Sequence, residues 1–138
     1  LKKMSKSEVS DLSRINLTDD KDQIINKIKK AKTDTLPLPS KIEELEKRPE
    51  AKNLIGIYSS LMNNTLEESI DEFAGKNFSE FKEKLSDVVV NEINPISLKI
   101  KELLDDKVFL EKILKDGYEK ANEIASKKIK KIHEIVGF

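Results

Sequence analysis

The sequence predicts an all-α protein, a bundle of five or six helices packed around one core. Apolar residues recur at helical spacing through every long segment, and prolines, glycines and asparagines lie between these segments. Only residues 88–90, three consecutive valines, favour a strand, and they lie inside a helical pattern longer than an ordinary strand. A chain of 138 residues suits one compact domain. We therefore expect one helical domain with tails.

The chain is expected to open without a helix. Residues 1–16 show no sustained period and are rich in Ser, Lys and Asp, so we expect a loop and then a short extended segment. Thr18, Asp19 or Asp20 suits the N-cap of the first helix, because its side-chain oxygen can accept hydrogen bonds from free amides. The apolar positions of this helix are Ile24, Ile25, Ile28 and Ala31. Its C-terminal half holds Lys27, Lys29, Lys30 and Lys32, where cations favour the helix dipole.

Prolines and asparagines delimit the next helix. The two prolines of residues 36–40 make this segment a connecting loop, because proline lacks an amide donor and disfavours a helix before it. Pro49 suits the first position of a helix that continues to about residue 61. Asn63 and Asn64 then stop this helix.

A short helix and two long patterns follow. Thr65 and Glu68 fit a capping box, and Gly75 ends the short helix because glycine accepts the left-handed conformation. A long helical pattern runs over residues 79–104, and Pro95 is expected to kink or split it. The remainder of the chain forms the final helix.

The composition excludes several classes of protein. Without cysteine, the chain can form neither disulfides nor a thiolate metal site. No apolar run has the length of a membrane span, and the first residues lack the apolar core of a signal peptide, so the cytosol is the expected compartment. The net charge is zero, yet residues 1–32 carry nine basic and five acidic side chains, and residues 127–138 carry four and one. Two basic ends attract a polyanion if they meet in space, although on charge alone solvated lysine faces are the better interpretation.

One short motif points to a chemistry. The chain begins with Lys3-Met4-Ser5-Lys6-Ser7 after two residues, and this pentapeptide is identical to the signature loop of class I aminoacyl-tRNA synthetases, which it therefore resembles. When a carboxylate attacks the α-phosphate of ATP, negative charge moves onto the departing pyrophosphate, and flexible ammonium groups can follow that charge. The resemblance implies that Lys6 contacts the transition state and that Lys3 assists it. The serines would donate hydrogen bonds to phosphate oxygens, and Met4 would seat the loop.

Longer segments carry a more specific resemblance. They are Ser13-Arg14-Ile15-Asn16-Leu17-Thr18-Asp19-Asp20, Lys30-Ala31-Lys32-Thr33-Asp34, Arg48-Pro49-Glu50-Ala51-Lys52-Asn53-Leu54-Ile55-Gly56-Ile57-Tyr58, and Gly117 with Lys120-Ala121. Along nearly its full length the chain resembles the C-terminal part of the bacterial-type tryptophanyl-tRNA synthetases. It departs from that pattern at Glu8 and Val9, where the family commonly has Asp-Pro, so the exit of the loop is less constrained.

The resemblance implies an organisation and a reaction. Residues 1–17 are expected to be the ATP loop and a connector to the catalytic domain, and residues 18–138 the C-terminal helical tRNA-binding domain. The Rossmann domain, with its His-Ile-Gly-His-type signature and tryptophan pocket, is expected upstream and absent from this chain, which opens at Leu1 without an initiator Met. The chain alone is therefore expected to be inactive. The expected substrates are tryptophan, tRNA(Trp) and ATP with Mg²⁺, and the expected full-length assembly is a cytoplasmic homodimer.

Other assignments remain open. Tyrosyl-tRNA synthetases are the nearest family, but their bacterial members tend to carry a different loop sequence and a further RNA-binding domain after the helices, which favours tryptophan. A non-catalytic RNA-binding helical module and a protein-interaction bundle are the remaining alternatives.

The residue types of the helical domain suit tRNA binding. The candidate phosphate contacts are Lys127, Lys128, Lys130 and Lys131. Tyr58, Tyr118 or Phe138 could stack on an unpaired base. Both tyrosines fall near apolar helical positions, however, where a ring in the core is the better interpretation.

No metal site or acid–base pair is expected. His133 is the only histidine and has no cysteine beside it, so a solvated helix position is the better interpretation. The aspartate pairs at residues 19–20 and 105–106 lie at expected helix starts, where capping explains them.

Overall fold

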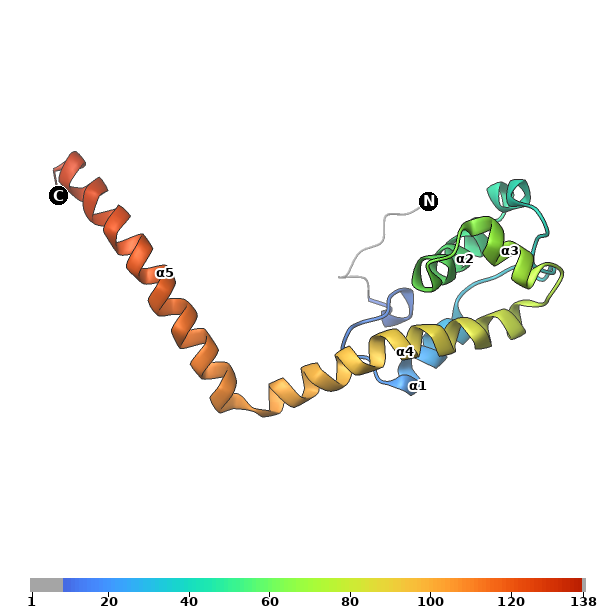
Figure 1. Cartoon of the computed structure of the whole chain (residues 1–138), viewed down its shortest axis with the longest axis horizontal. Coiled ribbons are helices and arrows are strands. Elements are labelled where there is room, and N and C mark those ends of the chain that lie inside the picture. The colour runs from blue at the N-terminus through green and yellow to red at the C-terminus, as the bar shows by residue number, and fades with distance from the viewer. Residues whose placement is uncertain (1–8, 138) are drawn as a thin grey trace. The chain divides into compact units, whose positions relative to one another are not determined.

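The chain folds into helices and loops. The computed structural model describes residues 9–137, so the predicted ATP loop at residues 3–7 lies outside the described residues. The elements are, in chain order, η1 (Asp11–Ser13), α1 (Lys21–Lys30), η2 (Ile42–Lys47), α2 (Pro49–Met62), α3 (Leu66–Phe73), α4 (Phe78–Asp105) and α5 (Lys107–Val136) (Figure 1). No strand occurs within residues 9–137, and residues 88–90 are helical. The prediction of an all-α fold is confirmed.

The chain divides into two compact units, which are described separately. The first extends to Leu98 and includes η1, α1, η2, α2, α3 and most of α4. The second begins at Lys99 and holds the end of α4 and the whole of α5. The predicted division between residues 17 and 18 stays a prediction.

Short-range capping sets several helix ends, as the sequence predicts. Asp20 caps α1, because its Oδ1 accepts from the Gln23 amide at 2.9 Å and its own amide donates to Gln23 Oε1 at 2.9 Å. Thr65 and Glu68 form the capping box of α3, with the Thr65 amide 2.7 Å from Glu68 Oε2. Gly75 follows α3 with a φ of 73°, in the left-handed region that glycine tolerates.

Pro95 does not split α4, which runs unbroken from residue 78 to residue 105. A proline removes one amide donor, here the partner of the Asn91 carbonyl. Both residues are exposed, so water can satisfy that carbonyl while the turns on either side keep their hydrogen bonds. The break falls instead at Asp106, whose Oδ1 accepts from the Phe109 amide at 3.0 Å and begins α5. Of the two expected effects of Pro95, the split is therefore wrong, and the kink stays a prediction.

Three aromatic rings form the centre of the core of the first unit. Tyr58 of α2, Phe73 of α3 and Phe81 of α4 meet edge to face. The ring centroids are 5.0 Å apart for Tyr58 and Phe73, 5.9 Å for Tyr58 and Phe81, and 4.9 Å for Phe73 and Phe81. The largest buried aliphatic side chains around them are Ile24, Leu45, Ile55, Ile70 and Leu85. Helices α1 to α4 and η2 therefore share one core.

Arg48 fixes the loop that follows α1. Its Nε and Nη2 donate to the two carboxylate oxygens of Asp34 at 2.9 and 2.7 Å, and its Nη1 donates to the Pro37 carbonyl at 2.7 Å. Its guanidinium carbon also lies 5.6 Å from the centre of the Phe78 ring, at the start of α4. The hydrogen bonds from Arg48 hold the pKa of Asp34 below its ordinary value. One guanidinium thus joins the loop to the starts of α2 and α4.

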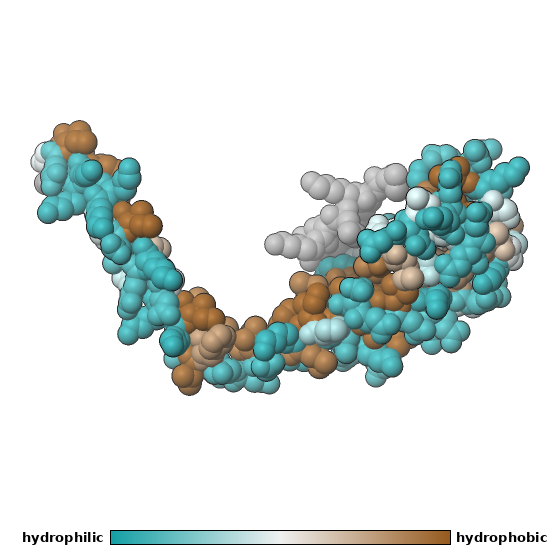
Figure 2. Space-filling view, viewed as in Figure 1, coloured by the Kyte–Doolittle hydropathy of each residue, from teal (hydrophilic) through white to brown (hydrophobic). Residues whose placement is uncertain are grey.

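The second unit is dominated by the amphipathic helix α5. Its apolar side chains, such as Ile113 and Ile124, are exposed in the structure and alternate with charged ones along the helix (Figure 2). Within residues 9–137 no helix combines the length and the apolar character that crossing a membrane requires.

We expect Phe81→Ala to lower the free energy of unfolding by about 3–5 kcal/mol, because it leaves a cavity where three rings meet. The matched control is Lys84→Ala, one turn further along α4 at an exposed position, where a change within about 0.5 kcal/mol is expected. Urea unfolding followed by circular dichroism measures both. Equal unfolding midpoints for the two variants would contradict the aromatic core.

We expect Asp34→Asn to cost less than about 1 kcal/mol at pH 7, because the ion pair with Arg48 is partly exposed. The pKa of Asp34 is lowered in the folded state, so the pair stabilises the fold above the ordinary aspartate pKa, and this contribution is lost as pH falls through the lowered value. The stability difference between wild type and variant should therefore shrink between pH 6 and pH 2 in thermal unfolding. Asp87→Asn, at an exposed position of α4, is the control. A difference that grows on acidification would refute the sign.

Candidate functional site

The four lysines predicted to contact tRNA lie on α5. Lys127, Lys128, Lys130 and Lys131 are all exposed. At about 100° per residue, they occupy about half of the helix circumference. Lys127 Nζ lies 2.7 Å from Glu123 Oε1, so part of this charge is already balanced. The helix offers one basic half-face at its C-terminal end, and the tRNA contacts stay a prediction.

The aromatic candidates for base stacking differ in exposure. Tyr58 is fully buried, as expected, and its hydroxyl donates to the carboxylate of Glu72 at 3.0–3.1 Å. Burial, together with that carboxylate, raises the pKa of Tyr58 to about 12. Tyr118 is 66% exposed on α5, so the expected core position is wrong for this ring within its own unit. Phe138 lies outside the described residues. Of the three, only Tyr118 is described with its ring accessible.

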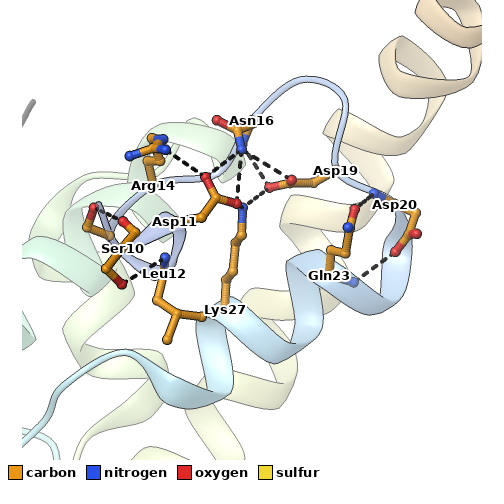
Figure 3. Close-up of polar contacts among 10 residues, drawn as sticks. Ser10, Asp11, Leu12, Arg14, Asn16, Asp19, Asp20, Gln23 and Lys27 are labelled. Atoms are coloured by element: carbon orange, nitrogen blue, oxygen red, sulfur yellow. Dashed lines mark hydrogen bonds and ion pairs between the residues drawn. The ribbon is translucent and has the colours of Figure 1, made fainter. Parts of the chain in front are cut away.

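A buried lysine joins the connector to α1. Lys27 is 6% exposed, and its Nζ donates to Asp11 Oδ2 and to Asp19 Oδ2, both at 2.6 Å (Figure 3). Asn16 binds both acids. Its backbone N–H donates to Asp19 Oδ2 at 2.8 Å, and its side-chain Nδ2 donates to Asp11 Oδ1 at 3.0 Å. Arg14 Nη2 lies 2.9 Å from Asp11 Oδ1. These five side chains are named here the connector cluster, and they hold residues 11–19 against the first helix.

The charges of the connector cluster balance. Two cations face two carboxylates, which offsets the cost of removing them from water. Burial alone would lower the pKa of Lys27, but its hydrogen bonds with Asp11 and Asp19 outweigh burial and raise that pKa. The bond from Lys27 is also the main reason why the pKa of Asp11 is lowered. Both shifts favour the charged forms of Lys27 and Asp11.

The connector cluster was not predicted from the sequence. Lys27 was assigned there to the lysines that favour the helix dipole and Asp19 to capping, whereas Asp20 makes the cap. A signal was present, because position 27 falls on the same helical face as Ile24 and Ile28, both buried. A lysine on an apolar face requires a buried acceptor, and the preceding connector supplies two.

A second buried lysine binds the C-terminal end of α1. Lys82 of α4 donates to the carbonyls of Lys29 and Ala31 at 3.3 and 2.5 Å. These carbonyls belong to the last turn and the C-cap of α1, where helical partners are missing and a cation is favoured. Burial lowers the pKa of Lys82, which is 8% exposed. Helix α1 thus donates one buried ammonium group to the connector and receives another at its C-terminal end.

An open hollow of about 1090 Å³ lies beside the Arg48 contacts, and Thr33, Lys76 and Asn77 are among its lining residues. Its charged groups are largely engaged, since Asp34 binds Arg48 and Lys76 Nζ lies 3.4 Å from Glu80. The hollow therefore does not identify a ligand by itself. In the part of the chain that the structure describes, no group of three or more His, Cys, Asp and Glu side chains could hold a metal ion.

The chain is similar to known proteins over its whole length. The family described as tRNA synthetases class I (W and Y) matches residues 1–94. A tryptophan–tRNA ligase of Agrobacterium fabrum is 50% identical over 137 residues, which cover 99% of this chain and 39% of that protein. Tryptophan–tRNA ligases of Brucella melitensis and Rickettsia conorii are 47% and 49% identical, and the matches cover 39% and 41% of their lengths. The chain thus spans about two fifths of the length of these relatives.

The family match covers the motif at residues 3–7, the connector cluster, the aromatic core and the Arg48 contacts. It extends over more than half of the chain. The chain belongs to the class I tRNA synthetases of the tryptophan and tyrosine family.

Proposed function

We propose that this chain is part of a tryptophan–tRNA ligase, which activates tryptophan with ATP and transfers it to tRNA(Trp). The observation that carries the proposal is the similarity, at 46–50% identity across 99–100% of this chain, to relatives named tryptophan–tRNA ligases. The unsubstituted pentapeptide at residues 3–7 supports the same reaction. Tyrosine remains the second substrate to test, because the family includes both kinds of enzyme.

The reaction has two steps. A carboxylate oxygen of tryptophan attacks the α-phosphorus of ATP, the bond from that phosphorus to the bridging oxygen breaks, and pyrophosphate leaves. A terminal ribose hydroxyl of the tRNA then attacks the carbonyl of the adenylate, and AMP leaves with the bonding electrons. ATP enters as its Mg²⁺ complex, as a substrate. In the first step negative charge grows on the leaving pyrophosphate, and catalysis requires groups that bind this charge more strongly than they bind ATP.

Residues 3–7 provide such groups in this proposal. Lys6 binds the pyrophosphate oxygens as charge develops, and Lys3 assists it. An ammonium group on a long flexible stem suits a moving charge better than the fixed fork of a guanidinium. Ser5 and Ser7 donate hydrogen bonds to phosphate oxygens, and Met4 seats the loop. The pocket for tryptophan and the remaining ATP contacts belong to the longer protein, which we place in the cytoplasm as a homodimer. The chain by itself is expected to be inactive.

The helices serve tRNA binding in this proposal. The exposed half-face of Lys127, Lys128, Lys130 and Lys131 supports contacts with phosphates, which lysines neutralise without reading sequence. Tyr118, exposed on the same helix, is available to stack on an unpaired base.

We expect Lys6→Ala in the full-length protein to slow adenylate formation by about 10²–10³-fold, because it removes one group that binds the developing charge. The dissociation constant of tryptophan should change less than about twofold, since that contact is made chiefly in the transition state. Tryptophan-dependent pyrophosphate exchange and equilibrium tryptophan binding measure the two effects.

Lys21→Ala, which removes an exposed lysine at the start of α1, is the control and should keep wild-type exchange. An unchanged exchange rate in Lys6→Ala would overturn the role of Lys6. Wild-type exchange that depends on tyrosine and not on tryptophan would overturn the choice of substrate.

We expect replacement of the four lysines at 127, 128, 130 and 131 by glutamine to raise the KM for tRNA(Trp) about tenfold or more. The slope of log affinity against log salt should become shallower by about 0.7–0.9 for each phosphate that the variant no longer neutralises. Pyrophosphate exchange does not require tRNA and should be unchanged. The matched control is the fourfold glutamine variant at Lys107, Lys112, Lys115 and Lys120 on the N-terminal half of α5. Equal effects of the two variants would show that position on the helix is irrelevant and would refute the assignment.

A further inference from the structure

We propose that Lys27 and Asp11 are positioning residues for adenylate formation, because they fix the segment that follows the ATP loop. The inference rests on the proposed function, which assigns residues 3–7 to ATP. Neither side chain is proposed to touch the substrate. Each acts by fixing the connector to which the predicted ATP loop is attached.

The distance along the chain makes the connection short. Ser7 precedes Asp11 by four positions, and an extended chain spans at most about 3.6 Å per residue. Four residues span at most about 14 Å even when fully extended. Asp11 is therefore a point of attachment close in the chain to the predicted ATP loop.

Polar contacts are the described means by which Asp11 is fixed. Element η1, which contains Asp11, has no buried residue, and its Leu12 only lines an open hollow beside Ile28 of α1. Asp11 instead binds the buried ammonium of Lys27 at 2.6 Å and also contacts Asn16 and Arg14 (Figure 3). Lys27 is held in turn by Asp19, whose side chain is 6% exposed. Lys27 of α1 therefore links the connector to the packed part of the first unit.

Helix α1 does not depend on Asp11 for its own structure. Its first turn has the capping box of Asp20, its middle buries Ile24 and Ile28, and its last turn is bound by Lys82. The bond between Lys27 and Asp19 lies between the helix and the residue just before its cap. The hydrogen bond from Lys27 to Asp11 attaches the part of the connector that is nearest in sequence to the predicted ATP loop. This separation makes Asp11 the residue to change first.

The physical consequence concerns orientation. Flexible lysines can follow a leaving group only from a defined starting position, and a misplacement of about 1 Å in a supporting residue can cost about 10²-fold in rate. Releasing the connector should therefore reduce the rate of the chemical step. Binding of tryptophan, which does not involve the loop lysines in this proposal, should not change.

The test uses the full-length protein with Asp11→Ala, which leaves Lys27 bound to Asp19 and so avoids an unpaired buried cation. We expect tryptophan-dependent pyrophosphate exchange, normalised to the number of tryptophan-binding sites, to fall by about 10–100-fold. The dissociation constant of tryptophan should stay within about twofold of wild type. A purely structural defect would reduce the number of binding sites but not the rate per site.

Three further variants sharpen the result. Lys27→Met should reduce the rate per site as Asp11→Ala does, and the double variant should be no slower than the slower single one, because both break the same attachment. Lys27→Arg, which keeps a buried cation, should recover part of the rate. Lys30→Met, an exposed lysine on the same helix, is the control and should keep the wild-type rate. If Lys27→Met does not fold, Asp11→Ala alone decides.

The outcomes separate the two proposals. If the wild-type protein catalyses tryptophan-dependent exchange and folded Asp11→Ala has the same rate per site, this inference is overturned and the proposed function stands. Wild-type protein without exchange on tryptophan or tyrosine would overturn the proposed function, and this inference with it. A reduced rate per site in Asp11→Ala that Lys30→Met does not share supports the inference.

Discussion

Two buried ammonium groups hold helix α1, and both neighbouring segments take their positions from it. Moving a lysine from water into a protein interior is unfavourable unless its donors are used, and removing one partner of such a group commonly costs about 3–5 kcal/mol. Lys27 uses its donors on two aspartates of the connector, and Lys82 uses its donors on carbonyls of the last turn of α1. The first lysine therefore places the connector, and the second places α4 relative to α1 within the first unit. These helices share an apolar core, and the two cations add polar contacts of defined geometry to that packing.

The features predicted correctly from the sequence depend on residues close together in the chain. Asp20 and Gln23 are three residues apart, as are Thr65 and Glu68, so their geometry follows from one turn of helix. The all-α class and the buried Tyr58 follow from apolar spacing in the same way. The absence of a split at Pro95 has a local explanation too, because a single exposed proline removes one hydrogen bond and leaves the rest of the helix intact.

The features that were missed join residues far apart. Lys27 meets Asp11 across 16 positions, and Lys82 meets Ala31 across 51 positions. No periodicity in one segment reports which distant acid or carbonyl will meet a buried cation, because that depends on how the helices pack. The sequence places Lys27 on the apolar face of its helix, but the helix dipole alone explains a lysine in the C-terminal half. N-capping in the same way explains Asp19. A charged residue that interrupts an apolar stripe therefore requires a named partner before it is assigned to solvent.

Charge-assisted contacts also join the loops of the first unit to its helices. Asp19 and Lys27 join the connector to α1, and Arg48 joins the loop after α1 to the start of α2. The contact from Arg48 is bidentate, so it fixes direction as well as distance. A loop that must follow a moving charge benefits from freedom in its lysines and from rigidity in its support, because motion of the support would add to the entropy lost in the transition state. In this chain Asp11 lies four residues after the end of the predicted ATP loop, and its hydrogen bond from the buried Lys27 provides such a support.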